Sequence, residues 1–374
     1  MATLMSESSI VIAFSKLTDP RKPRNRLYTL EDIICTAILA TLCRCEDYDE
    51  MSDWTEGNLD WLQSLGLCVE GAPSHDTYER FFRYLDSCEF QKCFLTWTDL
   101  LRGRLRETIA IDGKTLCNSR DVEKGPLHLV SAFATEHSLV LGQVKTVGKG
   151  GELAGMQQLL DILDLRGAVI TIDAGGCYKV IMEKIIEKKG DYVVCLKGNQ
   201  GQLHDEAENY FLQAMMMTPE ESGCAYWKTE ETAHGRIETR EIWASDDIDW
   251  LPQKNDWTGL RSLVCVKRTT LEKGITKQQT RYFISSLEAE AKHQGQIIRG
   301  HWGIENRVHW QLDVTFREDY SRVRKDNGAE NLSVLRRSTI NILRSDESSK
   351  ISLKRRRLRA SMNRDYLCKL MGAK

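Results

Sequence analysis

Apolar positions in the first quarter of the chain recur every three or four residues, as on one face of a helix. They include Leu30, Ile33, Ile34, Ala37 and Ile38. The turn-forming residues 71–74 (Gly-Ala-Pro-Ser) follow, and Ser74 or Asp76 can cap a further helix. The pattern predicts an N-terminal helical domain over residues 1–95.

From residue 108 onward the pattern changes to short apolar runs that are typical of β-strands. These runs cover residues 108–112, 127–134, 139–147, 168–173 and 191–196. Helical stretches near 152–163 and over 178–188 separate the last three of them. Three strands, then helix, strand, helix, strand, predict a mixed sheet that starts as a meander and continues through crossover helices. This is the element order of a ribonuclease H-like α/β domain, which we place at residues 96–200 and 287–345.

A β-rich insertion over residues 201–286 interrupts this α/β pattern. Its candidate strands are 224–229, 236–243, 260–266 and 280–285, and helical spacing returns over 301–312 and 331–343. The insertion also contains four tryptophans, which could stack on a displaced base or simply pack in a core. Core packing is the favoured interpretation for most of Trp227, Trp243, Trp250 and Trp257.

The composition is that of a folded, water-soluble protein. Of 374 residues, 41% are hydrophobic, 28% are charged and six are proline, which excludes a disordered or collagen-like chain. The longest apolar stretch, residues 33–43, is much shorter than the roughly 20 residues of a membrane-spanning helix. The start of the chain lacks the features of a secretory signal, so we expect a cytoplasmic protein. The 12 cysteines are scattered without a C-x-x-C pair, which favours reduced thiols.

Positive charge is concentrated at the end of the chain. The formal net charge of the whole sequence is -2, yet residues 335–374 contain twelve Lys or Arg against three Asp or Glu. We interpret residues 346–374 as a basic C-terminal tail. Such a tail can be a solvated terminus or an arm that binds phosphates.

Two of the predicted strands end in an aspartate. Asp112 closes the run Thr-Ile-Ala-Ile, and Asp173 closes the run Val-Ile-Thr-Ile. Either one alone can be a turn residue that accepts hydrogen bonds from backbone amides. If the two strands are neighbours in the sheet, however, both carboxylates lie at one edge and can share divalent cations, since Mg²⁺ prefers oxygen ligands.

The predicted helix over residues 301–312 offers a third carboxylate. Glu305 stands among apolar neighbours such as Ile304 and Val308, and a charge in such surroundings is costly unless a metal or a base compensates it. His301, Glu305 and His309 also share one helix face. That face could hold zinc, but the spacing is not H-E-x-x-H, and polar contacts along the helix are the simpler interpretation.

Six short segments together resemble one known family. They are residues 71–77 (GAPSHDT), 110–115 (AIDGKT), 171–174 (TIDA), 196–200 (LKGNQ), 234–236 (HGR) and 301–306 (HWGIEN). Over nearly its full length the chain resembles the DDE transposases of bacterial insertion sequences, in the branch that includes the Rhs-linked H-repeat-associated proteins. The resemblance implies that Asp112, Asp173 and Glu305 are the catalytic residues and bind two Mg²⁺ or Mn²⁺ ions.

The resemblance also implies the reaction and the partners. A DDE transposase cuts a phosphodiester at the end of its element and joins the freed 3′ hydroxyl to another strand. Its partner is double-stranded DNA, namely the terminal inverted repeats and the target, and it is expected to act as a homodimer in the bacterial nucleoid. Two alternatives stay open: a degenerate or domesticated relative that binds DNA without cutting it, and a metal-dependent DNA endonuclease without strand transfer.

Eleven basic residues are candidates for contacts with DNA phosphates. They follow the strand ends, flank the glutamate helix or belong to the tail: Lys114, Lys197, Arg299, Arg322, Arg324, Lys325, Arg336, Arg337, Arg355, Arg356 and Arg357. The chain departs from its relatives at two places. Ile298 and His301 stand where many related transposases have a tyrosine and an arginine, and the turn after Asp173 is unusually rich in glycine.

Overall fold

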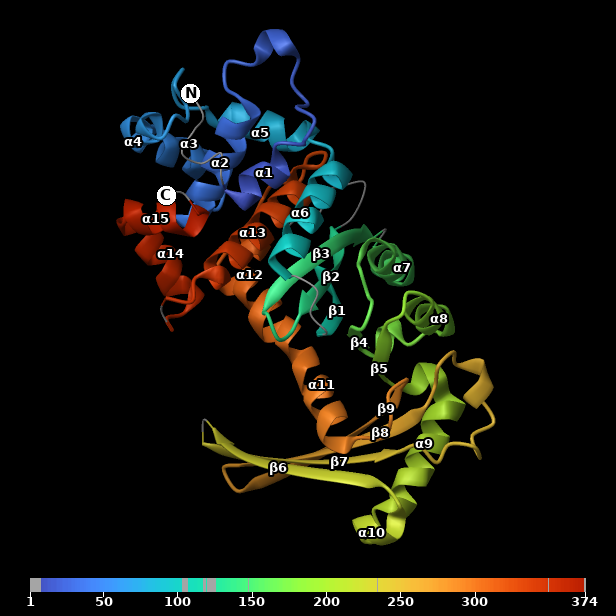
Figure 1. Ribbon diagram of the computed structural model, residues 1–374. Helices are drawn as coiled ribbons and strands as arrows, with labels where there is room; N and C mark the ends of the chain where they lie inside the picture. Colours follow the sequence, from blue (N-terminus) through green and yellow to red (C-terminus); the bar gives the residue numbers. More distant parts are fainter. Residues whose placement is uncertain are drawn as a thin grey trace.

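The computed structural model describes residues 8–102, 107–116, 119, 126–146, 148–233, 235–348 and 350–372. Helices gather around one end of a long sheet, and a β-meander extends from the other end (Figure 1). One helix, α11 (Ala291–Ile304), runs between these two parts. The predicted α/β class, with an N-terminal helical region and a β-rich insertion, is confirmed.

Six helices form the N-terminal region: α1 (Ser9–Phe14), α2 (Leu30–Leu42), α3 (Tyr48–Gly57), α4 (Leu59–Ser64), α5 (His75–Tyr84) and α6 (Ser87–Arg102). Helix α2 is central and almost wholly buried. A capping box starts it, because Thr29 Oγ1 accepts from the amide of Asp32 at 3.0 Å and the Asp32 carboxylate accepts from the amide of Thr29 at 2.8 Å. The helical prediction for this region is correct.

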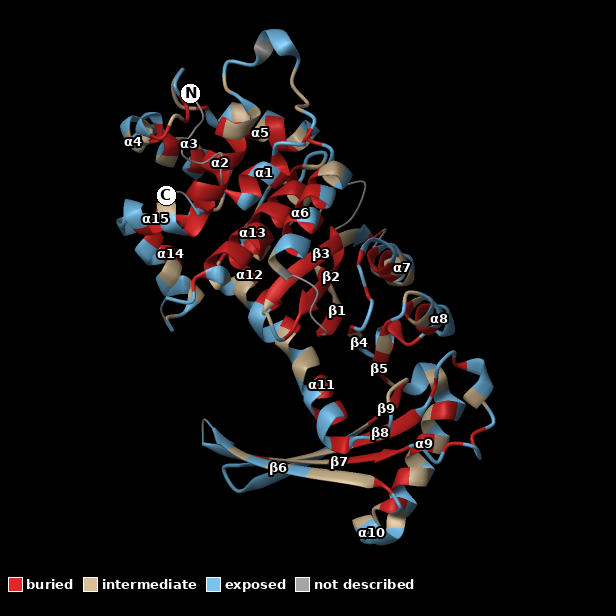
Figure 2. Ribbon diagram, in the orientation of Figure 1, coloured by how far each residue is buried: buried red, intermediate tan, exposed pale blue. Residues whose placement is uncertain are grey.

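The C-terminal segment is folded, and it is not a free basic arm as the charge run suggested. After α13 (Gly328–Ser345) come α14 (Leu353–Met362) and α15 (Arg364–Met371). Leu367 and Met371 belong to the same hydrophobic core as the N-terminal helices. Burial of these apolar positions holds the segment against α2 and α13 (Figure 2).

The sheet contains nine strands in the order β3-β2-β1-β4-β5-β9-β8-β7-β6. Its first half is the predicted meander followed by two crossover units: β1 (Thr108–Thr115), β2 (His128–Ala134), β3 (Leu139–Thr146), β4 (Val169–Ile172) and β5 (Asp191–Cys195). Strands β1, β4 and β5 are parallel, and β2 and β3 are antiparallel additions beside β1. Helices α7 (Glu152–Ile162) and α8 (Lys179–Glu187) make the two connections.

The insertion continues this sheet and does not form a separate block. Its strands are β6 (Ala225–Ala233), β7 (Arg236–Ser245), β8 (Ser262–Glu272) and β9 (Ile275–Ser285), and β9 pairs with β5. The insertion starts with two helices, α9 (Gly201–Ala214) and α10 (Pro219–Ser222), where we expected only strands. The spacing of Leu203, Ala207, Phe211 and Ala214, all buried, explains α9.

Helix α11 crosses the meander formed by β6–β9 at a glycine. A Cβ atom on Gly295 would lie 2.9 Å from the ring of Trp227 and 3.1 Å from Ile242, so the close approach requires glycine. Beyond residue 304 the helix continues as a π-helical segment (Glu305–His309) and then as α12 (Trp310–Val314). The helix predicted over 301–312 is therefore confirmed in position but is not uniformly α-helical.

Three further expectations concern the cysteines, the tryptophans and membrane-spanning helices. Among the described cysteines all are free and most are buried, in agreement with reduced thiols, and Cys117 lies outside the described residues. Trp243 and Trp257 are buried in the core, and Trp250 stacks on Tyr210 with ring centroids 5.1 Å apart. No helix in the described part of the chain has both the length and the apolar character that crossing a bilayer demands.

Candidate functional site

Two parallel strands bring the predicted aspartates to one edge of the sheet. Ile111 of β1 is in register with Ile172 of β4, and this is the last residue pair between the two strands. The next residues, Asp112 and Asp173, therefore lie side by side where the pairing ends. Asp112 is still within β1, and its Oδ1 accepts from the amide of Gly113 at 2.8 Å. Asp173 follows β4 and is exposed. The sheet thus brings together two carboxylates that are far apart in the sequence.

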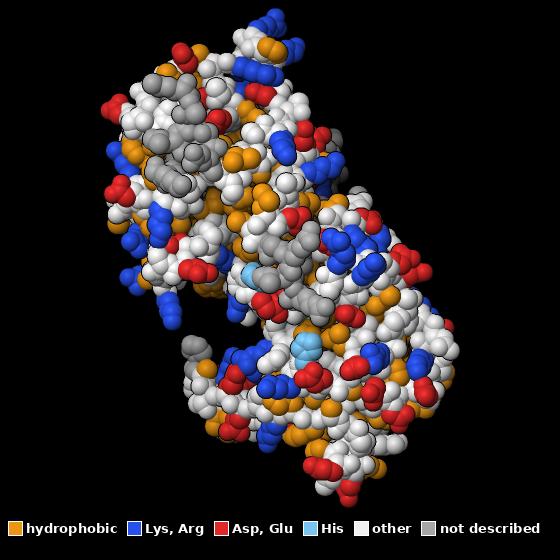
Figure 3. Space-filling view, viewed as in Figure 1, with side chains coloured by type: hydrophobic (Ala, Val, Ile, Leu, Met, Phe, Trp, Pro, Cys, Tyr) orange, Lys and Arg blue, Asp and Glu red, His pale blue; other side chains and the backbone are white. Residues whose placement is uncertain are grey.

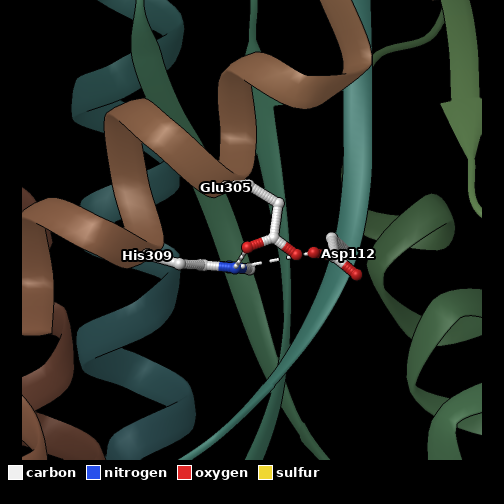
Figure 4. Close-up of side chains that lie close together, drawn as sticks. All are labelled: Asp112, Glu305 and His309. Carbon is white, nitrogen blue, oxygen red and sulfur yellow. Dashed lines mark ion pairs between the residues drawn. The ribbon is translucent and has the colours of Figure 1, made fainter. Parts of the chain in front are cut away.

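Glu305 reaches the same edge of the sheet from a helix. It is the first residue of the π-helical segment, and the preceding α11 packs on β1 and β4. Single π-turns within α-helices occur mostly at functional sites, because the wider turn changes the direction of nearby side chains. Figure 4 shows the Glu305 carboxylate directed at Asp112.

His309, four residues after Glu305, completes a compact cluster. Its Nδ1 lies 3.5 Å from Oδ2 of Asp112 and 3.8 Å from Oε2 of Glu305 (Figure 4). One ligand atom from each of the three residues lies within 4.8 Å of the others. Asp173 is not part of this tight group. The oxygen and nitrogen donors nevertheless suit a hard or borderline divalent cation.

Electrostatic repulsion between carboxylates characterises the site. Burial, and after it the charge of Glu305, raises the pKa of Asp112 to about 8, and the charge of Asp173 acts in the same direction. The neighbouring imidazole of His309, 3.8 Å away, lowers the pKa of Glu305. Carboxylates that repel one another in this way are stabilised by a bound cation, so the donor set fits a metal.

The carboxylates line a cavity of about 450 Å³. Lys197 and Arg281 also line it, so positive groups face the acidic edge. His301 Nδ1 lies 3.0 Å from Oγ1 of Thr171 on β4, and burial lowers the pKa of this histidine. The predicted polar face of the helix is therefore real, with His301 and His309 each turned toward the sheet.

The glycine-rich turn after β4 holds Asp173. The amide of Gly175 donates to Oδ1 of Asp173 at 3.0 Å, so the aspartate caps a short 3₁₀ turn (Ala174–Gly176). Gly176 is sterically required, because a Cβ atom there would lie 2.2 Å from Cγ2 of Ile172. The unusual composition of the turn is thus compatible with a well-placed carboxylate.

The segment 196–200 (LKGNQ) supports the same turn. Asn199 donates to the carbonyl of Ala174, and Gln200 donates to the carbonyl of Cys177, both at 2.9 Å. Lys197, between strand β5 and these two residues, is exposed and lines the cavity. The segment 234–236 is only partly described, because His234 lies outside the described residues.

Some of the predicted DNA contacts are wrong, because their charges are buried. Lys114 is 8% exposed, and its Nζ lies 2.6 Å from Asp313 and 3.3 Å from Asp319. Arg336 and Arg337 are also buried and surround Glu318. These side chains hold helices and loops together, and none can face a DNA backbone.

The arginines predicted in the tail also include both buried and exposed side chains. Arg357 is 1% exposed, stacks over the ring of Phe316 at 4.1 Å and pairs with Glu46 at 2.8 Å. Arg356 donates to backbone carbonyls, one of them Asp346 at 2.6 Å. The predicted contacts that do lie on the surface are Lys197, Arg299, Arg322, Arg324, Lys325 and Arg355. Arg299 pairs with the carboxylate of Glu231.

Two residues near the carboxylates were not predicted as site residues from the sequence. His309 was noted on the helix face, but its approach to Asp112 depends on how α11 packs on β1. Arg281 of β9 lines the cavity although it belongs to no motif. Its signal was the alternation of Gln279, Arg281 and Phe283, which places these side chains on one face of the strand.

Two family models match most of the chain. The family model described as Transposase DDE domain matches residues 103–342, and one described as DDE_Tnp_1-associated matches residues 11–98. The chain is 37% identical to the H repeat-associated putative transposase YhhI of Escherichia coli (strain K12), with 96% of each chain covered. It is 36% identical to the Putative transposase YncI of Escherichia coli O157:H7, with 99% of this chain and 96% of that protein covered.

One solved structure shows a weaker similarity. It is titled as a cryo-EM structure of the piggyBac transposase synaptic complex with hairpin DNA. The TM-score is 0.45 at 14% identity, with 99% of this chain and 80% of that chain covered.

Proposed function

Because this chain belongs to the DDE transposases, in the branch that includes the H repeat-associated proteins, we propose that it cuts and joins DNA at the ends of an insertion sequence. Asp112, Asp173 and Glu305 are the proposed catalytic residues. The observation that carries the proposal is the convergence of these carboxylates, from two parallel strands and one helix, on a single cavity.

The proposed metal ligands are the same three side chains, with His309 as a candidate fourth. A pair of bound Mg²⁺ or Mn²⁺ ions would lower the pKa of the attacking water or hydroxyl and stabilise the leaving oxygen. The raised pKa of Asp112 supports this assignment, because a cation bound there would take the place of the proton.

The remaining groups around the cavity would position the phosphate. Lys197 and Arg281 face the carboxylates across the cavity and can neutralise the charge of a phosphodiester. Exposed Arg322, Arg324 and Lys325 follow the catalytic helix and are proposed to contact the duplex backbone. We expect the active complex to be a homodimer on paired terminal repeats.

A cleavage assay with labelled element ends tests the proposal. In Mg²⁺ or Mn²⁺ the protein should nick the end and join the 3′ hydroxyl to a target duplex. Asp112→Asn, Asp173→Asn and Glu305→Gln should each bind DNA but lose nicking, by at least about a hundredfold. Asp60→Asn, an exposed change on α4, is the matched control.

Each alternative gives a distinct result in the same assay. Cleavage without joined product would identify an endonuclease. Binding without any cleavage by the unmodified protein would identify a degenerate relative. Full nicking by any one of the three carboxylate variants would refute the assignment of that residue.

A further inference from the structure

A groove rich in arginine lies between α11 and the face of the β6–β9 meander on which α11 packs. Six arginines line it: Arg236, Arg240, Arg268, Arg281, Arg299 and Arg307. We call it the arginine groove. Its volume is about 390 Å³. Figure 3 shows Lys and Arg side chains on the meander where it faces the hollow beneath the C-terminal helices.

The arginines share this face because of strand alternation. Arg236 and Arg240 are separated by an even number of positions on β7, and Arg268 faces the same side from β8, where it is in register with Arg240. Arg281 adds a fourth from β9, and Arg299 and Arg307 come from the helix opposite. Positions between them, such as Lys267, point to the other side of the sheet.

Nearby acids neutralise only part of this charge. Glu238 is buried between Arg240 and Arg268, and Glu231 pairs with Arg299. Nη1 of Arg240 lies 3.5 Å from the Glu231 carboxylate, and Nε of Arg268 is buried without a hydrogen-bond partner in the described part of the chain. Burial, followed by the charges of Arg299 and Arg268, lowers the pKa of Arg240. The six arginines outnumber the two glutamates that pair with them, so the groove has an excess of cations, which an anion can satisfy.

The arginine groove opens into the catalytic cavity. The two share Gln279, Arg281, Phe283, Ile298 and Trp302 as lining residues. The Trp302 ring is 45% exposed, with the Arg281 guanidinium 4.8 Å from its centroid. A polyanion that places one phosphate beside Asp112 and Asp173 can thus continue into the groove without leaving the surface.

We propose that the arginine groove binds the phosphates of one unpaired DNA strand that extends from the cleavage position. The proposal rests on the function proposed above, which puts a phosphodiester at the carboxylates. A space of this volume matches a small-molecule pocket, so it accepts one strand and excludes a base-paired duplex. A cationic track beside an exposed aromatic ring is the usual way that proteins hold single strands.

The test compares two probes on a cleavage-deficient background. In the Asp112→Asn protein without divalent metal, fluorescence anisotropy measures affinity for a blunt duplex and for the same duplex with a single-stranded extension of roughly ten thymidines. Arg268→Gln and, separately, Arg236→Gln are introduced. The matched control is Lys267→Gln, which removes the same charge one position away on the opposite face of β8.

The proposal is supported if the arginine variants weaken binding to the extended probe and leave binding to the blunt duplex unchanged. We expect Arg268→Gln and Arg236→Gln each to lower that affinity about 3- to 10-fold and to reduce the salt slope by about 1. The blunt duplex, and both probes with Lys267→Gln, should be unaffected. Arg236 is exposed, so its variant should fold even if loss of the Glu238 partner unfolds the other.

Three results would overturn the proposal: equal loss on both probes, no loss on either, or the same loss with Lys267→Gln. The measurement needs no cleavage, so it separates the two proposals. A protein that binds the extended strand through these arginines but never nicks DNA would count against the transposase chemistry alone.

Discussion

His309 Nδ1 lies 3.5 Å from Oδ2 of Asp112, so a helix residue and a strand residue from distant parts of the chain share one cluster. Residues that orient or supplement metal ligands typically change affinity or activity 10- to 100-fold when mutated. We therefore expect His309→Ala to lower metal-dependent cleavage about 10- to 100-fold, with DNA affinity unchanged. Titration with Mn²⁺ should recover part of the loss.

The control for His309 is on the same helix. His293→Ala changes an exposed histidine of α11 and should cleave at the normal rate. Normal cleavage by His309→Ala at limiting Mn²⁺ would show that the imidazole plays no part in the site.

Lys114 and Lys197 should behave in opposite ways, although both lie near the site, Lys114 within β1 and Lys197 just after β5. Lys114 lies between Asp313 and Asp319, so Lys114→Ala removes the buried positive charge that these two acids share and should destabilise the protein by about 1–3 kcal/mol. Lys197→Ala should leave stability unchanged and weaken binding of duplex DNA, with a lower salt slope. Urea unfolding and anisotropy titrations measure the two effects, and the opposite assignment of losses would contradict the structure.

Two glycines of α11 provide a second matched pair. Gly295→Ala places a methyl group 2.9 Å from Trp227, which forces the helix away from the meander and should cost about 1–2 kcal/mol despite the better helix propensity of alanine. Gly300→Ala meets only Thr135 at 3.4 Å, so it should be neutral or stabilising. Because Glu305 follows on the same helix, Gly295→Ala should also slow cleavage. Equal stability of the two variants would argue against the close packing.

Asp346 should make the C-terminal helices sensitive to acid. Burial alone would raise the pKa of this carboxylate, but hydrogen bonds from Ser348, Tyr366 and Lys369 outweigh burial and lower it. A group with a lowered folded pKa stabilises above its unfolded value, near 4, and loses this contribution as the pH falls further. The stability difference between the unmodified protein and Asp346→Asn should therefore be about 1 kcal/mol at pH 7 and shrink progressively as the pH falls below about 4. Thermal unfolding across this pH range measures it, and a constant difference would exclude the mechanism.

Local patterns in the sequence determined the elements and the three carboxylates. The strand runs before Asp112 and Asp173 are legible because a buried strand needs consecutive apolar residues. Asp173 follows the end of β4, whereas β1 continues past Asp112 to Thr115. Glu305 was identified through the resemblance carried by residues 301–306, since its side chain is 55% exposed and not in the core surroundings that its apolar neighbours suggested. Helix α9 carried an equally local signal, in the spacing of Leu203, Ala207, Phe211 and Ala214, which the expectation of a β-rich insertion obscured.

Tertiary structure alone decided which charged side chains are available. Lys114, Arg337 and Arg357 look like surface cations in the sequence, yet each is buried beside an acid from a distant segment. Arg268 and Arg281 belong to no motif, yet strand pairing and the packing of α11 place them in one groove. Hydrophobic periodicity specifies which face of an element is buried, but the partner of a charge depends on how separate elements pack. That packing is a property of the whole fold, and local spacing cannot reveal it.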